Sequence, residues 1–430
     1  MIRALRQDIP KLALSEKISQ QWRKHTKYIG LTLFGLILSA DISTSGADLS
    51  PSQYPVFENL KNNTVVDSSK GGFSVAIAPS PFDVLGLNNN FLSESAKILQ
   101  YSGINSAEIM ISPQFCSGNI TYHNPNLCDN RSLLFVSQQP EYQRVFSMGL
   151  NRVYITAETF NGSNSWQFGT VDEKKYKEGC KQTYDEYKDF FDSLLNQYGD
   201  SDTEFVVVVP NEIDWLLLSS NTGKTNYNTE DLQNVRDTSP SSRSVKNAIS
   251  YLSAIGKAKN DANLSHIGKQ KIRLLVEVNN VVASMDQKKK SAIAEVIPSV
   301  ARYLDGVGYS AYDSLNIDLQ NNDMAFLKLT RTIQYIKNAT QLPVYLTEVS
   351  IARPWWNENY ESRRIKDYAY EYKIKRLLEV LKNTDLKGIN WWELFSNEID
   401  NDRWSIIDRR GMLVMPFFNA VNSVYKKSLY

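Results

Sequence analysis

Two segments of the chain place a glutamate at the end of an apolar run. Phe205–Val209 is followed closely by Glu212, and Leu342–Thr347 is followed directly by Glu348. A carboxylate at the end of a buried strand is costly to desolvate unless a neighbour pairs with it or a reaction uses it. Two carboxyl groups about 5–5.5 Å apart can act as nucleophile and acid/base on one glycosidic bond. Glu212 and Glu348 are therefore the candidate catalytic pair.

Other side chains near these glutamates could bind a sugar. Asn211 precedes Glu212 and could donate its amide to a sugar hydroxyl, and Tyr312 is placed to donate its phenol to Glu348. A tryptophan ring can stack on the C–H face of a sugar. The candidates for stacking are Trp391, Trp392, Trp355 and Trp356. For the last two, packing within a long loop is an equally good interpretation.

The elements that must position these residues follow from periodicity. From residue 71 onward, apolar β-branched runs alternate with amphipathic helical runs. The expected strands are Phe73–Ala78, Ser106–Ile111, Arg152–Ala157, Phe205–Val209, Ile272–Val278, Gly306–Tyr309, Val344–Thr347 and Gly388–Trp392. The expected helices are Phe91–Gln100, Pro140–Met148, Thr183–Tyr198, Val245–Lys259, Lys288–Tyr303, Asp323–Lys337, Ser362–Asn383 and Pro416–Lys426.

Eight strand-then-helix units predict an α/β fold, a (β/α)8 TIM barrel in a single domain. Catalytic side chains of such barrels project from the C-terminal ends of the strands, where this chain would carry long loops. Glu212 and Glu348 then follow the fourth and seventh strands and face each other across the barrel mouth. An open nucleotide-binding sheet is disfavoured, because the turn after the first strand, Ala78–Phe82, has no glycine-rich motif.

Charge and histidine content exclude several other classes. The chain has 48 Lys and Arg against 47 Asp and Glu, and residues 1–28 alone carry a net charge of +5. The remaining body is mildly acidic, so we expect no nucleic-acid partner. His25, His123 and His266 are scattered, which predicts no metal site and no cofactor.

The first 40 residues have the composition of an export signal. A basic stretch precedes an apolar run of about ten residues and the small residues Ser39 and Ala40. Either a cleaved signal or an uncleaved membrane anchor fits, and both place the body outside the cytoplasm. The domains are then this segment (1–40), a polar linker (41–70) and the barrel (71–430), expected to be a monomer. Cys116 and Cys128 could form a disulfide, or they could be unrelated.

At the residue level the chain resembles the large clan of retaining glycoside hydrolases with a (β/α)8 barrel, which includes cellulase-like, mannanase-like, xylosidase-like and galactanase-like families. The resemblance spans residues 71–426 as short motifs. It rests on Asn211-Glu212, Glu348, Trp391-Trp392, Asp408–Gly411 and Pro416-Phe-Phe.

The resemblance implies roles for individual residues. Glu212 would be the acid/base, Glu348 the nucleophile, and Tyr312 the hydrogen-bond partner of Glu348. Trp392 would form the floor of the subsite for the reacting sugar, with Trp391 as the second choice. The substrate would be an oligosaccharide or polysaccharide, cleaved by double displacement.

The chain also departs from the clan's pattern. Several families carry an Arg at the end of the second strand and a His near the third, whereas this chain has Ile109–Ser112 and Thr156–Glu158 there. Ser310 stands where a His is often found. These departures leave open a catalytically inactive barrel that binds carbohydrate or serves as a scaffold.

Overall fold

The computed structural model describes residues 72–78, 91–113, 132–219, 239–287, 289–315, 322–352, 360–395, 405–407 and 414–425. All of them belong to one compact unit, residues 54–430. The predicted export segment, the pair Cys116 and Cys128, and the pair Trp355 and Trp356 lie outside the described residues. None of the described helices is both long and apolar enough to cross a membrane.

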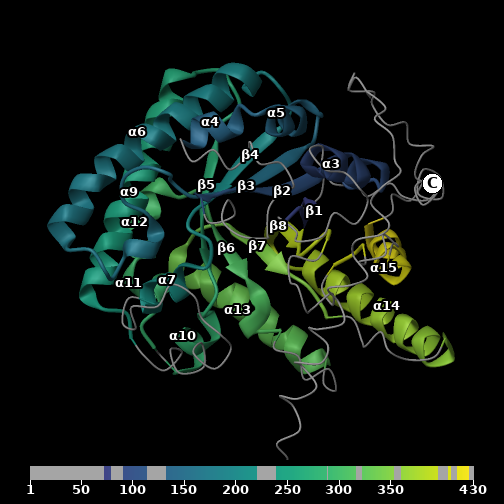
Figure 1. The fold of residues 1–430 in the computed structure, drawn as a ribbon. Coiled ribbons are helices and arrows are strands. Elements are labelled where there is room, and N and C mark those ends of the chain that lie inside the picture. The colour runs from purple at the N-terminus through teal and green to yellow at the C-terminus, as the bar shows by residue number, and fades with distance from the viewer. Residues whose placement is uncertain are drawn as a thin grey trace, which may run out of the picture. The chain divides into compact units, whose positions relative to one another are not determined.

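Eight parallel strands close into a barrel in chain order, with the last strand pairing to the first (Figure 1). The predicted fold is therefore confirmed. The strands are β1 Phe73–Ala76, β2 Ser106–Ile111, β3 Arg152–Ala157, β4 Glu204–Val208, β5 Arg273–Val278, β6 Gly306–Ser310, β7 Val344–Val349 and β8 Leu386–Trp391. Each predicted strand is present, and the differences are confined to the strand ends.

Helices surround the barrel on the outside (Figure 1). They are α3 Phe91–Tyr101, α4 Leu133–Ser137, α5 Pro140–Ser147, α6 Glu173–Tyr198, α7 Ile213–Ser219, α9 Ser242–Ser265, α10 Val281–Gln287, α11 Ala292–Glu295, α12 Ile297–Val300, α13 Asn322–Thr340, α14 Tyr360–Lys382 and α15 Met415–Tyr425.

Two helix predictions were wrong in extent. The single helix expected over Lys288–Tyr303 is broken into α11, α12 and a 3-10 turn, because Pro298 has no N–H and is tolerated only in the first turn of a helix. Helix α6 begins ten residues before the predicted Thr183. The side chain of Asp172 caps its N-terminus by accepting the N–H groups of Lys174 and Lys175.

The inside of the barrel changes from apolar to polar along the strands. Tyr154, Leu275 and Tyr345 belong to a small inner cluster that is separate from the main core between strands and helices. Two residues further along β3, β5 and β7, the alternation of side chains turns Thr156, Glu277 and Thr347 inward as well, and all three are buried. The barrel therefore has an apolar floor below a polar upper layer.

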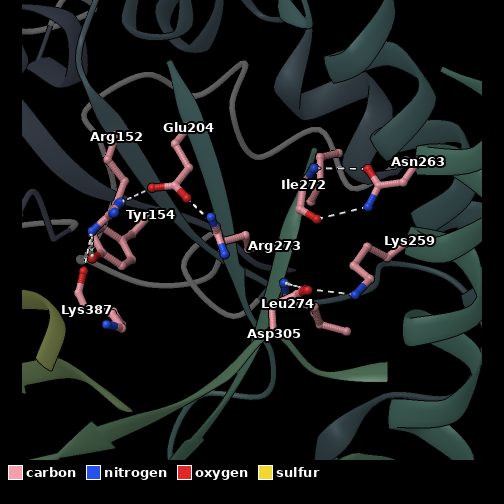
Figure 2. A network of polar contacts seen from close by, with 10 residues as sticks. All are labelled: Arg152, Tyr154, Glu204, Lys259, Asn263, Ile272, Arg273, Leu274, Asp305 and Lys387. Carbon is pink, nitrogen blue, oxygen red and sulfur yellow. Dashed lines mark hydrogen bonds and ion pairs between the residues drawn. The ribbon is translucent and has the colours of Figure 1, made fainter. Parts of the chain in front are cut away.

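Charged side chains tie together the N-terminal ends of the strands (Figure 2). Glu204 on β4 forms ion pairs with Arg152 on β3, at 2.5 Å, and with Arg273 on β5. The Nη1 atom of Arg152 also donates to the carbonyl of Lys387, which lies on β8, at 2.9 Å. Because the chemistry of such barrels takes place at the opposite, C-terminal ends of the strands, we assign this network to holding the barrel closed.

Candidate active site

The two candidate catalytic glutamates meet at one hydroxyl. Ser310, at the end of β6, has its Oγ atom 3.0 Å from Oε1 of Glu212 and 3.4 Å from Oε2 of Glu348. The separation of these two carboxylate oxygens cannot exceed the sum of the two distances. The structure thus brings together two carboxyl groups that lie 136 positions apart in the chain.

An irregularity in β7 directs Glu348 toward this hydroxyl. Strand residues normally alternate between the two faces, yet Leu346 and Val349, three positions apart, both lie in the outer core. The pairing of β7 with β8 shifts register between these same two residues, and the pairing with β6 matches Ser310 to Glu348 after a second shift. A bulge of this kind re-aims a side chain beside an active site, and here it gives Glu348 an inward position.

The main chain at Glu212 is unusual for a residue with a side chain. Its φ is 48°, in the left-handed region, immediately before α7 begins. That conformation costs an L-residue roughly 1–3 kcal/mol and persists only where the surroundings hold it. Here the N–H of Glu212 donates to Oε2 of Glu277 at 2.9 Å. Glu212 thus follows β4 in the chain, and its main chain is bound by Glu277 on β5.

Asp214 joins the loops that follow β4 and β5. Its Oδ2 atom accepts the main-chain N–H groups of Asn279 and Asn280 at 3.1 and 3.2 Å, and its Oδ1 atom accepts that of Ala292 at 2.8 Å. The side chain is 2 % exposed, so these amides are shielded from water. Asp214 thereby anchors the segment that carries Glu212.

Another carboxyl group, that of Glu108 on β2, is buried in the polar layer. Its Oε1 atom accepts the hydroxyl of Thr156 at 2.6 Å, and its other oxygen accepts the amide of Asn390. The same amide reaches the carbonyl of Thr347 at 3.0 Å. This network crosses the barrel from β2 and β3 to β7 and β8.

The carboxyl groups in the barrel raise one another's pKa values. Burial raises the pKa of Glu348 well above its usual range, and the charges of Glu277, Glu212 and Glu108 raise it further, while the hydroxyl of Ser310 opposes the shift. Burial likewise raises the pKa of Glu212 and that of Glu277, and it raises the pKa of Glu108 to about 8. Like charges at such short range cannot all ionise, so ionisation of one carboxyl group disfavours ionisation of the others.

The aromatic candidates occupy different environments. Burial and the charges of Glu348, Glu393 and Glu212 raise the pKa of the Tyr312 phenol, which places it among the site's carboxylates. Trp392 is partly exposed. Trp391 is fully buried in the outer core, and its ring centroid lies 5.0 Å from that of Phe417 on α15. Trp391 is therefore a packing residue, which leaves Trp392 as the candidate sugar platform.

Asn211 and two other polar residues at strand ends, Glu158 and Asp313, lie in different environments. Asn211 is partly exposed beside Glu212. Glu158 after β3 accepts the hydroxyls of Ser165 and Tyr251 at 2.8 and 3.0 Å, and burial raises its pKa to about 7. Asp313 accepts the N–H of Val282 at 2.7 Å and the phenol of Tyr309. Glu158 and Asp313 thus hold neighbouring segments in place.

The structure also identifies residues that the sequence did not single out. Ser310 stands where a His is often found in the clan, yet its hydroxyl contacts both glutamates. Asp214 gave no signal beyond its position two residues after Glu212, because its partners are main-chain amides that any residue could supply. Within the described ranges no group of three or more His, Cys, Asp or Glu side chains is arranged to hold a metal ion.

No protein-family model matches the chain, and no curated protein does. Several glycoside hydrolases are among the solved structures that it resembles. A β-glucuronidase from an uncultured Clostridium is 11 % identical with a TM-score of 0.49 over 83 % of this chain, which spans only 50 % of that enzyme. A GH5 cellulase affiliated with Bacteroidetes is 12 % identical with a TM-score of 0.48, over 84 % of this chain and 92 % of the cellulase.

The GH53 catalytic domain of Ignisphaera aggregans is 12 % identical with a TM-score of 0.46, over 85 % of this chain and 99 % of the domain. At this level of similarity the names of those enzymes say nothing of the substrate of this chain. We therefore base the proposed function on the geometry of the site.

Proposed function

We propose that the protein is a retaining β-glycoside hydrolase that cleaves an oligosaccharide or polysaccharide by double displacement. Glu348 is the nucleophile and Glu212 the acid/base. Tyr312 orients Glu348, Asn211 binds a sugar hydroxyl, and Trp392 forms the floor beneath the reacting sugar. Trp355 and Trp356 remain candidates for further stacking. In this proposal the barrel acts outside the cytoplasm as a monomer.

One observation supports this function above the others, the contact of Glu212 and Glu348 with the same hydroxyl of Ser310. Carboxyl groups of inverting enzymes stand about 6.5–9.5 Å apart to admit a water, whereas those of retaining enzymes are closer, at about 5–5.5 Å. A single hydroxyl that reaches both carboxylates is compatible with the shorter separation.

The proposed chemistry follows from the environment of each carboxyl group. Glu212 must carry a proton for the departing glycosidic oxygen, and its burial favours the protonated form. Glu348 must be ionised to attack the anomeric carbon; burial and its carboxyl neighbours raise its pKa, so its ionised form requires those neighbours to stay protonated, and the hydroxyl of Ser310 supports it. After the sugar is transferred to Glu348, ionised Glu212 would take a proton from water, which hydrolyses the intermediate.

Replacing Glu348 with Gln tests the assignment directly. We expect turnover of aryl β-glycosides to fall on the order of 10³-fold or more, because the covalent intermediate can no longer form. Glu158→Gln is the matched control, since it removes another strand-end carboxyl and should retain activity within about tenfold. Equal turnover by wild type and Glu348→Gln would rule out the proposed nucleophile.

Replacing Glu212 with Gln separates the acid from the nucleophile. The loss should be about 10²- to 10⁴-fold on substrates with a poor leaving group and much smaller on activated aryl glycosides, which need no proton. An equal loss on both substrate types would argue against the acid role. Sugar binding without turnover by the wild-type protein would instead indicate the inactive carbohydrate-binding barrel.

A further inference from the structure

Glu277 contacts the proposed acid/base through the main chain rather than through a side chain. It lies on β5 with its carboxyl turned into the barrel, and it is 1 % exposed. Its Oε2 atom accepts the N–H of Glu212 at 2.9 Å. The roles proposed above leave this buried carboxyl without a function.

The conformation of Glu212 requires a partner of this kind. A residue with a side chain leaves the left-handed region unless its surroundings fix it there, and Glu212 has a φ of 48°. A rotation of this main chain would carry the carboxyl of Glu212 away from Ser310. The oxygen of Glu277 is therefore placed where it can decide the direction in which Glu212 points.

We propose that Glu277 is a positioning residue, whose carboxyl oxygen holds the main chain of Glu212 in the left-handed conformation and so aims the acid/base at the glycosidic oxygen. The effect of Glu277 on the aim of the acid/base rests on the proposed function. The hold on the main chain does not, because it follows from the hydrogen bond and the backbone angle alone.

Glu277 also faces other titratable groups. Glu212 approaches it from the end of β4, Glu108 from β2, and Glu348 and Tyr312 from the ends of β7 and β6. A carboxyl in this position disfavours ionisation of its neighbours, since like charges repel. Glu277 therefore has a positional effect through its oxygen and an electrostatic effect through its charge, and two substitutions can separate them.

The test compares Glu277→Gln with Glu277→Leu in the full chain. Gln keeps an oxygen that can accept the N–H of Glu212 but carries no ionisable group, whereas Leu has similar bulk and no acceptor. Hydrogen–deuterium exchange with residue-level fragmentation measures the Glu212 amide. We expect exchange at Glu212 to match wild type in the Gln variant and to be at least about tenfold faster in the Leu variant. Glu108→Leu removes another buried carboxyl of the barrel and should leave this amide protected.

Kinetics on aryl β-glycosides supply the second readout. Glu277→Gln should retain turnover within about threefold of wild type and move the bell-shaped pH profile toward lower pH, because a repelling neighbour is gone. Glu277→Leu should lose about 10²-fold on substrates with poor leaving groups and much less on activated ones.

Each outcome bears on one proposal or the other. Unchanged protection of the Glu212 amide in a folded Glu277→Leu protein overturns the positioning role, whatever the activity. If the Leu variant does not fold, loss of Glu212 protection in the Gln variant, which keeps the acceptor oxygen, overturns it. A wild-type protein without glycosidase activity would refute the proposed function, and amide exchange alone would then decide the role of Glu277.

Discussion

At the scale of single residues, Ser310 is the side chain that links the two halves of the site. It has one proton to donate, and it lies within hydrogen-bond distance of a carboxylate oxygen on either side. A hydrogen bond to the ionised form of a carboxyl group lowers its pKa, and the Ser310 hydroxyl has this effect on both Glu212 and Glu348. A serine therefore opposes the burial that would otherwise keep both groups protonated.

Substitution of Ser310 by Ala should impair catalysis and alter its pH dependence. Loss of the hydroxyl raises the pKa of both glutamates, so both limbs of the pH profile should move toward higher pH, opposite to the shift expected for Glu277→Gln. A hydrogen bond to a charged group is worth about 1.5–3 kcal/mol, which corresponds to a loss of about 10- to 100-fold in kcat/KM.

The control for this substitution is Ser314→Ala. The Oγ atom of Ser314 donates to the carbonyl of Ala311 at 2.9 Å, so the Ser314 variant should keep the wild-type pH profile. A Ser310→Ala profile that overlays that of wild type would show that the shared hydroxyl does not influence either carboxyl group.

At the scale of elements, the active-site loops are coupled to one another. Helix α7 follows Glu212 directly, and Asp214 in its first turn binds main-chain amides just after β5 and at the start of α11. A charged acceptor that satisfies several buried N–H groups is expensive to remove, because each amide is left without a partner in a site that water does not reach. The position of the catalytic loop thus depends on the loop of the neighbouring strand.

Asp214→Ala should therefore destabilise the fold and reduce activity together. Leaving buried amides unpaired costs about 1–3 kcal/mol each, so we expect the free energy of unfolding to fall by roughly 3 kcal/mol or more. Urea denaturation followed by tryptophan fluorescence measures this change. Asp385→Ala removes a surface carboxylate, whose exposed ion pairs with Lys337 and Lys387 contribute little to stability, and should leave the midpoint near that of wild type. Equal midpoints for the two variants would contradict the anchoring role of Asp214.

At the scale of the whole molecule, the fold buries carboxyl groups both inside the barrel, as at Glu108, and beyond its strand ends, as at Glu158 and Asp313. Burial raises the pKa of Glu108 to about 8, that of Glu158 to about 7 and that of Asp313 to about 6. In the unfolded chain these groups titrate near pH 4. Between those values the folded protein binds more protons than the unfolded chain, so its stability is greatest at low pH within this window and decreases as the pH rises.

Thermal unfolding between pH 5 and pH 8 should show this dependence. Each such group lowers the free energy of unfolding by about 1.4 kcal/mol per pH unit while it is protonated only in the folded state. Glu108→Gln, which carries no charge, keeps one acceptor oxygen for the amide of Asn390 and can donate its own amide to the hydroxyl of Thr156, should make the decrease less steep. A melting temperature that rises from pH 5 to pH 8 would contradict burial of these carboxyl groups in protonated form.

The sequence predicted the architecture because the fold consists of eight similar strand-then-helix units, each visible in a short stretch of sequence. Each strand is a short apolar run and most helices are amphipathic, so the eight units could be counted without any knowledge of their contacts. The breaks near Pro298 and the early start of α6 at Asp172 were missed, because a cap and a single proline compete with periodicity over only a few residues. The placement of Glu212 and Glu348 at the ends of the fourth and seventh strands followed from that count, and their catalytic roles stay predictions.

The sequence by itself thus determined that this is an eight-stranded barrel and which carboxyl groups stand at its strand ends, since both depend on residue type and local order. Only the tertiary structure decided which of two adjacent tryptophans faces the core, which hydroxyl joins the two glutamates, and which carboxyl holds the main chain of Glu212. Those relations depend on a bulge in β7, on which side chains of each strand point into the closed barrel, and on contacts between strands far apart in sequence. The local sequence pattern does not predict these relations, because a hydrogen bond between β5 and a loop after β4 depends on the register of the whole sheet.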